Sequence, residues 1–286
     1  MHRLPVSYSD LGRLHVYTSA RAPSTSSSHV MRRQVEEVHK ERVDGVLVAS
    51  LAYAAVETMC ESSFENGLAV ADGTLRRLDI ERELLEEATE KLAARRKGVE
   101  VAREVARYAD GRAESGGESI ARAVMIREGM LPSDLQREFR DPLDSHATYR
   151  ADFVFELASG KTVIGEFDGK AKYEDPALLG GRTVLDALRE ERQRESRITL
   201  LGMPVLRFTW NDVRKRGRLA DMLRAAGVTP NTLGERDYRA TALKLRRGFL
   251  PCERPVRKGA RLALRSERAL PTQVRGSDAL PPTRFC

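Results

Sequence analysis

The sequence predicts an α/β protein in which a mostly helical region precedes a mixed β-sheet flanked by helices. Two observations support this fold class. Residues 29–109 contain apolar patterns of helix length, and the segments Ile80–Ala94 and Val99–Tyr108 are rich in Glu, Leu, Ala and Arg, which are strong helix formers. Residues 110–228 then change to short apolar or alternating segments in the order helix, three strands, helix, strand, helix, which is typical of a sheet covered by helices.

Composition excludes several classes of protein. The chain has 286 residues, of which 41% are hydrophobic, enough to bury a core. No apolar stretch approaches the roughly 18 residues of a membrane span, and the N-terminus lacks the apolar segment of a signal peptide. Three widely spaced cysteines, Cys60, Cys252 and Cys286, favour neither a disulfide framework nor a cysteine zinc site. We therefore expect a cytoplasmic protein with no membrane partner.

The positive charge is concentrated at the C-terminal end. Residues 229–286 hold 13 Lys or Arg and 5 Asp or Glu, a net charge of +8, so the other 228 residues carry a net charge of −1. This composition predicts a basic, largely disordered tail that adds nonspecific affinity for nucleic acid. A solvated tail with no dedicated role is the alternative.

The first half divides into two segments. Residues 1–28 are weakly patterned and predict a poorly ordered segment, and residues 29–109 predict a helical region with one short strand. The compact apolar run Val46–Ala49 fits a buried strand. Helices are expected at Leu51–Met59, Asn66–Leu78, Ile80–Ala94 and Val99–Tyr108.

The second half, residues 110–228, begins with a helix at Ser115–Glu128, where Ser115 and Glu118 have the spacing of a capping box. Strands are expected at Asp134–Arg140, Tyr149–Leu157, Thr162–Asp168 and Pro204–Trp210. Alternation in the second of these predicts one side formed by Tyr149, Ala151, Phe153 and Phe155. Helices are expected at Thr183–Leu201 and Asp212–Ala226.

Three acidic residues interrupt these apolar strands. Asp152 lies among Ala, Phe and Val, and Glu166 and Asp168 share one face of the next strand. An unpaired buried carboxylate is costly, whereas carboxylates on adjacent strands can share a divalent cation. Such a metal can activate water and stabilise charge on a phosphate. The pattern predicts a site for Mg²⁺ or Mn²⁺ bound by Asp152 and Glu166.

Four segments together resemble the PD-(D/E)xK nuclease superfamily, especially its very-short-patch-repair-like endonuclease branch. They are ESGGESIARAVM, YRADFVFEL, VIGEFDGKAKY and ERQRESRITLLGMPVLRFTWNDV. The resemblance covers about residues 110–228 and implies a restriction-endonuclease-like fold with Mg²⁺-dependent cleavage of nucleic acid, DNA in the first place.

The resemblance places an acid–metal site on Glu118, Asp152 and Glu166. The position two after Glu166, usually Lys in that superfamily, holds Asp168, and Lys170 offers a match shifted by two residues. In this interpretation Glu118 orients a water or the metal, and Lys170 stabilises the developing phosphate charge. Contacts to phosphates are expected from Lys172, Arg192, Gln193 and Arg194.

A second resemblance covers residues 32–80, RRQVEEVHKERVDGVLVASLAYAAVETMCESSFENGLAVADGTLRRLDI. This segment is similar to the middle section of AbiEi-like regulators of type IV toxin–antitoxin systems, which leads into a nuclease-like domain. The family implies a toxin as a partner, and a homodimer is the alternative. Residues 1–28 are too few for the three helices of a winged helix-turn-helix, so we expect no operator-reading domain there.

Structural interpretations of the same residues stay open. Glu118 could only complete the capping box, and Asp152 could pair with Arg150 or Arg207. Glu166 and Asp168 could simply end a strand at Gly169. The residues predicted to contact phosphates could instead be solvated, in a loop for Lys170 and Lys172 and on the solvent-exposed face of a helix for Arg192, Gln193 and Arg194. The competing function is accordingly a non-catalytic toxin–antitoxin regulator or nucleic-acid-binding protein with the same fold, and Asp168 at the lysine position favours it.

Overall fold

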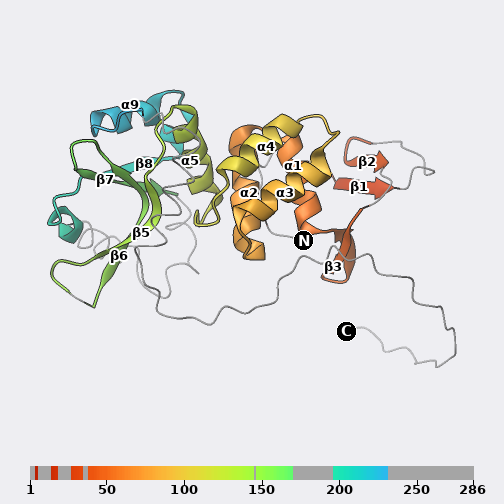
Figure 1. The fold of residues 1–286 in the computed structure, drawn as a ribbon, viewed down its shortest axis with the longest axis horizontal. Coiled ribbons are helices and arrows are strands. Elements are labelled where there is room, and N and C mark those ends of the chain that lie inside the picture. Colours follow the sequence, from red (N-terminus) through yellow and green to blue (C-terminus); the bar gives the residue numbers. More distant parts are fainter. Residues whose placement is uncertain are drawn as a thin grey trace, which may run out of the picture. The chain divides into compact units, whose positions relative to one another are not determined.

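The computed structural model describes residues 4–5, 14–18, 27–34, 38–144, 146–169 and 196–230 (Figure 1). By internal contacts the chain divides into Met1–Lys244 and Leu245–Cys286, and every described residue belongs to the first unit. Helices α1 to α5 precede a four-stranded mixed sheet with short helices, which confirms the predicted α/β class. Among the described residues, no helix combines the length and apolar character needed to cross a bilayer.

Two small strand pairs precede the helices. Strands β1 (Leu14–Thr18) and β2 (Val30–Gln34) are parallel, and β3 (Lys40–Val43) and β4 (Val46–Ala49) form an antiparallel hairpin. Strand β1 lies in the segment that the sequence predicted to be poorly ordered. The predicted strand at β4 is confirmed, but its predicted burial is wrong: Val46 and Leu47 are 50% and 58% exposed. Among the described residues the apolar run pairs with the polar strand β3 alone, which leaves Val46 and Leu47 in solvent, whereas Val48 and Ala49 are half-buried.

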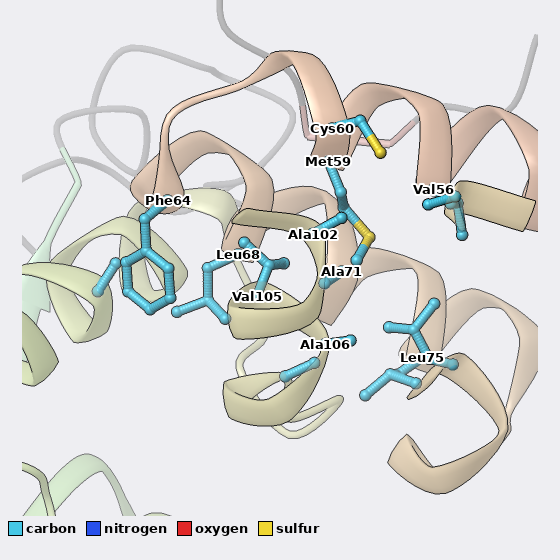
Figure 2. Close-up of a cluster of buried hydrophobic side chains, with 14 residues drawn as sticks. Val56, Met59, Cys60, Phe64, Leu68, Ala71, Leu75, Ala102, Val105 and Ala106 are labelled. Carbon is cyan, nitrogen blue, oxygen red and sulfur yellow. The ribbon is translucent and has the colours of Figure 1, made fainter. Parts of the chain in front are cut away.

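Four helices then form a compact core. They are α1 (Leu51–Glu61), α2 (Phe64–Leu78), α3 (Arg82–Ala93) and α4 (Val99–Tyr108), which confirms all four predicted helices. The helical core consists of Val56, Met59, Cys60, Phe64, Leu68, Ala71, Leu75, Leu85, Ala93, Ala102, Val105, Ala106, Ala109 and Ala123 (Figure 2). Gly98, at φ +84°, precedes α4, and a Cβ there would lie 1.9 Å from the carbonyl oxygen of Cys60. Only glycine allows α4 to approach α1 this closely.

Helix α5 (Gly116–Arg127) contacts both the helical region and the sheet. It contributes Ala123 to the helical core, and Ala121 and Met125 to a cluster beneath the sheet. A fully buried ion pair also joins it to α2, because Arg122 Nη2 lies 2.8 Å from both carboxylate oxygens of Asp72. The position of α5 is thus fixed from two sides.

The sheet has the strand order β5-β6-β7-β8. Its strands are β5 (Asp134–Arg140), β6 (Thr148–Glu156), β7 (Thr162–Asp168) and β8 (Val205–Thr209). The first three are antiparallel, and β8 runs parallel to β7, so the predicted mixed sheet is confirmed (Figure 1).

Each face of the sheet has its own hydrophobic cluster. The α5 cluster, which includes residues of helices α8 (Trp210–Arg214) and α9 (Arg218–Ala225), consists of Ala121, Met125, Met130, Leu135, Phe153, Phe155, Val163, Phe167, Phe208, Val213, Leu219, Ala220, Leu223 and Val228. The Tyr149 cluster consists of Tyr149, Ala151, Val154, Ile164 and Ile198. Burying each large apolar side chain contributes about 1.5–3 kcal/mol, so these clusters hold the sheet between its covering elements.

Two sequence predictions in this region are wrong. Tyr149 and Ala151 do not share a side with Phe153 and Phe155, since the two pairs belong to different clusters. The change occurs where Gln136 of β5 adopts a left-handed backbone, φ +52°, and interrupts the pairing with β6. The predicted helix Asp212–Ala226 is instead two helices, because Gly217, at φ +74°, breaks it between α8 and α9.

Candidate functional site

The predicted acids lie on the two central strands of the sheet. Asp152 is in the middle of β6 and Glu166 near the end of β7, as predicted for neighbouring strands. The pairing of β6 with β7 ends at Phe153 and Gly165, and Asp152 and Glu166 are the residues next to this last pair on each strand. Asp168 ends β7 and pairs with Thr209 of β8. The sheet therefore brings all three acids to the region where β7 ends.

Hydrogen bonds hold Asp152 from two directions. The backbone N–H of Phe167 donates to Asp152 Oδ2 at 2.9 Å, and Gln136 Nε2 lies 3.4 Å from Oδ1. The same Gln136 nitrogen donates to Glu118 Oε2 at 2.9 Å. One amide thus bridges two carboxylates from different elements and joins them in one cluster.

Glu118 has the predicted structural role and also belongs to this cluster. Its backbone N–H donates to Ser115 Oγ at 3.1 Å, and Ser115 Oγ donates to Glu118 Oε1 at 2.7 Å. The N–H of Glu114 donates to Glu118 Oε2 at 2.8 Å. The pKa of Glu118 is raised above its ordinary value, first by burial and then by the charge of Asp152. The capping interaction is confirmed, and it places the acid close enough to Asp152 for their charges to repel.

Glu166 has different neighbours. The hydroxyl of Tyr149 donates to Glu166 Oε1, and Arg207 of β8 is the residue paired with Glu166 in the parallel register. Of the two arginines considered as partners for Asp152, Arg150 forms an ion pair with Glu114 at 2.7 Å. The two predicted metal ligands thus contact separate sets of side chains.

Gln136 and Tyr149 are site residues that the sequence interpretation missed. Nothing in the sequence marks Gln136, because a left-handed backbone is most often adopted by Gly, Asn or Asp. Tyr149 carried a usable signal, since a buried tyrosine hydroxyl normally has a hydrogen-bond partner. The strand alternation alone places Tyr149 with apolar residues and gives no partner for its hydroxyl.

The residues predicted to contact phosphates lie outside the described residues. The lysines, arginines and glutamine concerned all fall within residues 170–195: Lys170, Lys172, Arg192, Gln193 and Arg194. Of the predicted helix Thr183–Leu201, only the part from residue 196 is described, and residues 196–199 are helical. The structure therefore gives positions for the predicted acids alone, and the metal site and its phosphate contacts stay predictions.

A divalent cation needs oxygen ligands in a suitable arrangement. Within the described ranges, no group of three or more His, Cys, Asp or Glu side chains is arranged to hold a metal. Mg²⁺ needs only one or two carboxylates, because it keeps several of its waters, so Asp152 and Glu166 fit it by the chemistry of their oxygens. A pocket of about 320 Å³ lies at the far end of β6, lined by Phe155, Glu156, Leu157 and Val228 among others, and it includes none of the four predicted site acids.

Substitutions at Glu118 separate its two roles. A carboxyl whose pKa is raised in the folded state stabilises the protein below its unfolded pKa of about 4.3, and this stabilisation is lost as the pH rises through the folded pKa. Glu118→Gln keeps a residue that can cap the helix and removes the negative charge. The new amide can also donate a hydrogen bond to Gln136 Oε1, an atom that is buried and has no hydrogen-bond partner among the described residues. We expect the free energy of unfolding of this variant to fall less than that of the wild type between about pH 4 and pH 8.

Glu118→Ala is the matched control, because it removes the charge and the hydrogen bonds together. It should lower the free energy of unfolding by about 1–3 kcal/mol relative to Glu118→Gln, since buried donors lose their acceptor. Urea denaturation at several pH values measures both effects. Equal pH dependence in wild type and Glu118→Gln would contradict the raised pKa of Glu118.

Comparison with known proteins gives relatives of unassigned role. Two proteins match over 183 residues at 32% identity: Uncharacterized protein Rv2248 of Mycobacterium tuberculosis (strain ATCC 25618 / H37Rv) and Uncharacterized protein MT2308 of Mycobacterium tuberculosis (strain CDC 1551 / Oshkosh). Each match covers 63% of this chain and 61% of the relative, so it spans about three fifths of the relatives' length. No family model matches the chain, and no solved structure matches it. The chain is similar to these mycobacterial proteins, and its function has to be inferred from its own residues.

Proposed function

We propose that this protein is a metal-dependent nuclease that hydrolyses phosphodiester bonds of nucleic acid, with a restriction-endonuclease-like fold of the PD-(D/E)xK type. The observation that supports this most is that Asp152 and Glu166 lie on the adjacent central strands β6 and β7, each next to the last pair of the register, Phe153 and Gly165. The order of α5, three antiparallel strands and a parallel fourth strand agrees with the fold that the sequence resemblance implies.

Electrostatics adds a second argument. A structural core gains nothing from placing like charges together, yet Glu118 and Asp152 share the Gln136 amide and repel each other. Clusters of this kind are enriched at functional sites, where a cation or a proton offsets the repulsion. In this proposal Asp152 and Glu166 hold Mg²⁺ or Mn²⁺, which would activate water and offset negative charge on the phosphate when bound.

The chain's own residues supply orientation and proton transfer. Gln136 and the Phe167 N–H fix both oxygens of Asp152, and the Tyr149 hydroxyl fixes Glu166. Glu118 can accept a proton near neutral pH more readily than an ordinary carboxylate, because its pKa is raised. Lys170 remains the proposed partner of the phosphate charge.

The alternative is a non-catalytic regulator of an AbiEi-like toxin–antitoxin system that binds nucleic acid or a toxin. Two observations favour it: Asp168 stands where the superfamily usually has Lys, and both oxygens of Glu118 already accept hydrogen bonds within the protein. A cleavage assay decides between the two functions.

The assay uses duplex DNA with Mg²⁺, Mn²⁺ or EDTA, and the Asp168→Lys variant tests the register of the site. We expect cleavage with either metal and none with EDTA. If Glu166 and position 168 form the acid–lysine pair, Asp168→Lys raises the rate, because it restores a cation near the phosphate. If Asp168 and Lys170 form that pair, the same change abolishes cleavage. No cleavage by the wild type under any metal would contradict the nuclease and favour the regulator.

A further inference from the structure

The connection between α8 and α9 carries an unusual density of positive charge. Four of the five consecutive positions 214–218 are basic and exposed: Arg214, Lys215, Arg216 and Arg218. We call this segment, Arg214–Arg218, the basic turn. Gly217 has a left-handed backbone, φ +74°, and is the N-cap residue of α9, so it separates this helix from α8.

The charges of the basic turn are only partly offset. Arg218 Nε lies 3.4 Å from Asp212 Oδ1, and Arg214 lies over the Trp210 ring at 5.2 Å. Within the part of the chain that the structure describes, no ion pair or hydrogen bond involves the side chains of Lys215 and Arg216. Holding like charges together costs free energy through repulsion, and an anionic partner removes that cost.

A chain of contacts through Trp210 and Phe167 connects Arg214 of the basic turn to Asp152. The Trp210 ring meets the Phe167 ring edge to face at 5.2 Å, and the backbone N–H of Phe167 donates to Asp152. Strand β8, which leads into α8, lies beside β7, and its Thr209 pairs with Asp168 (Figure 1). Helices α5, α8 and α9 all contribute to the α5 cluster. The helix that carries Glu118 and the two helices that flank the basic turn therefore cover the same face of the sheet.

We infer that the basic turn binds the phosphate backbone of the nucleic acid that the Asp152–Glu166 site is proposed to cut. The inference rests on the proposed function for the identity of the partner. Lys and Arg contacts to phosphates position a nucleic acid without reading its sequence, which suits four exposed cations in five consecutive positions. The phosphate backbone then lies across the end of β8, next to the end of β7, where the acids gather.

The test is DNA binding by Lys215→Ala/Arg216→Ala in the full-length protein. Fluorescence anisotropy of a labelled duplex, in EDTA and at several salt concentrations, gives Kd and its salt dependence. Loss of two phosphate contacts should lower the slope of log K against log salt by about 1.8 and weaken binding on the order of tenfold at low salt. The matched control is Arg95→Ala/Lys97→Ala, which removes two exposed cations between α3 and α4 and should leave the slope nearly unchanged.

The outcomes separate this inference from the proposed function, because binding is measured without metal and cleavage is measured in parallel. A lower slope in Lys215→Ala/Arg216→Ala alone supports the basic turn as a phosphate-binding surface, even if the wild type cuts nothing. An unchanged slope, or equal changes in both double variants, overturns the inference even if the wild type cuts DNA with Mg²⁺. Absence of any DNA binding by the wild type overturns it as well.

Discussion

Asp152→Asn should reduce metal-dependent cleavage by on the order of 10²–10³-fold or more, because it keeps the shape of the side chain and removes the charge that holds the cation. The variant should fold. Its amide oxygen can still accept the Phe167 N–H, and the repulsion with Glu118 disappears, so the free energy of unfolding should stay equal or rise. Glu166→Gln should lose activity in the same way, since it removes the neighbouring ligand.

The control for this experiment is Asp221→Asn on α9. Asp221 is exposed and pairs with Arg224 at 2.8 Å, away from the acids of β6 and β7. It should retain wild-type cleavage and stability, because exposed ion pairs contribute about 0–1 kcal/mol. A large loss of stability in Asp152→Asn would instead identify Asp152 as a structural ion-pair partner, and the nuclease proposal would lose its main support.

Arg122→Ala should destabilise the protein by about 3–5 kcal/mol, because it leaves the Asp72 carboxylate buried without its cation. Both side chains are essentially inaccessible, at 1% and 0% exposure, and Arg122 also donates to the backbone carbonyl of Tyr108 at 2.7 Å. The loss is measured by chemical denaturation. Glu118 lies one helical turn before Arg122 on α5. We therefore expect loss of the Arg122–Asp72 ion pair to make the position of Glu118 in the candidate site less well defined.

Two further variants make this prediction specific. Arg127→Ala, on the same helix, removes a half-exposed arginine 2.7 Å from Glu65 and should cost no more than about 1 kcal/mol. Replacing both buried partners, as in Asp72→Leu/Arg122→Met, should recover much of the lost stability, because no isolated charge remains in the core. Equal losses in Arg122→Ala and Arg127→Ala would show that the Asp72–Arg122 pair does not hold α2 and α5 together.

The fold could be predicted from the sequence wherever local patterns and tertiary packing agree. The capping spacing of Ser115 and Glu118 gave the start of α5 correctly, and the four strands were found from alternation and apolar runs. The prediction was wrong where the backbone conformation of one residue changes which side chains share a face of β6 or where a helix ends. Gln136 and Gly217 each adopt a positive φ that ends an otherwise regular pattern, and for Gln136 the residue type gives no hint of it.

The candidate site could be predicted in part for a similar reason. Acidic residues in apolar strands stand out, so Asp152 and Glu166 could be proposed from the sequence, and the structure places them on adjacent strands. The neutral residues that orient them do not stand out. Gln136 and Tyr149 acquire their roles only when β5, β6 and β7 are paired, which is long-range information that a local pattern lacks.

The central claim is that Asp152 and Glu166 bind one divalent cation, and the direct measurement is anomalous difference density in a crystal soaked with Mn²⁺. We expect a single Mn²⁺ peak that lies within about 2.0–2.6 Å of oxygens of both carboxylates, and no peak in crystals of Asp152→Asn. Carboxylates more than about 10 Å apart, or no peak beside either of them at saturating Mn²⁺, would contradict it, because one ion cannot bridge such a distance.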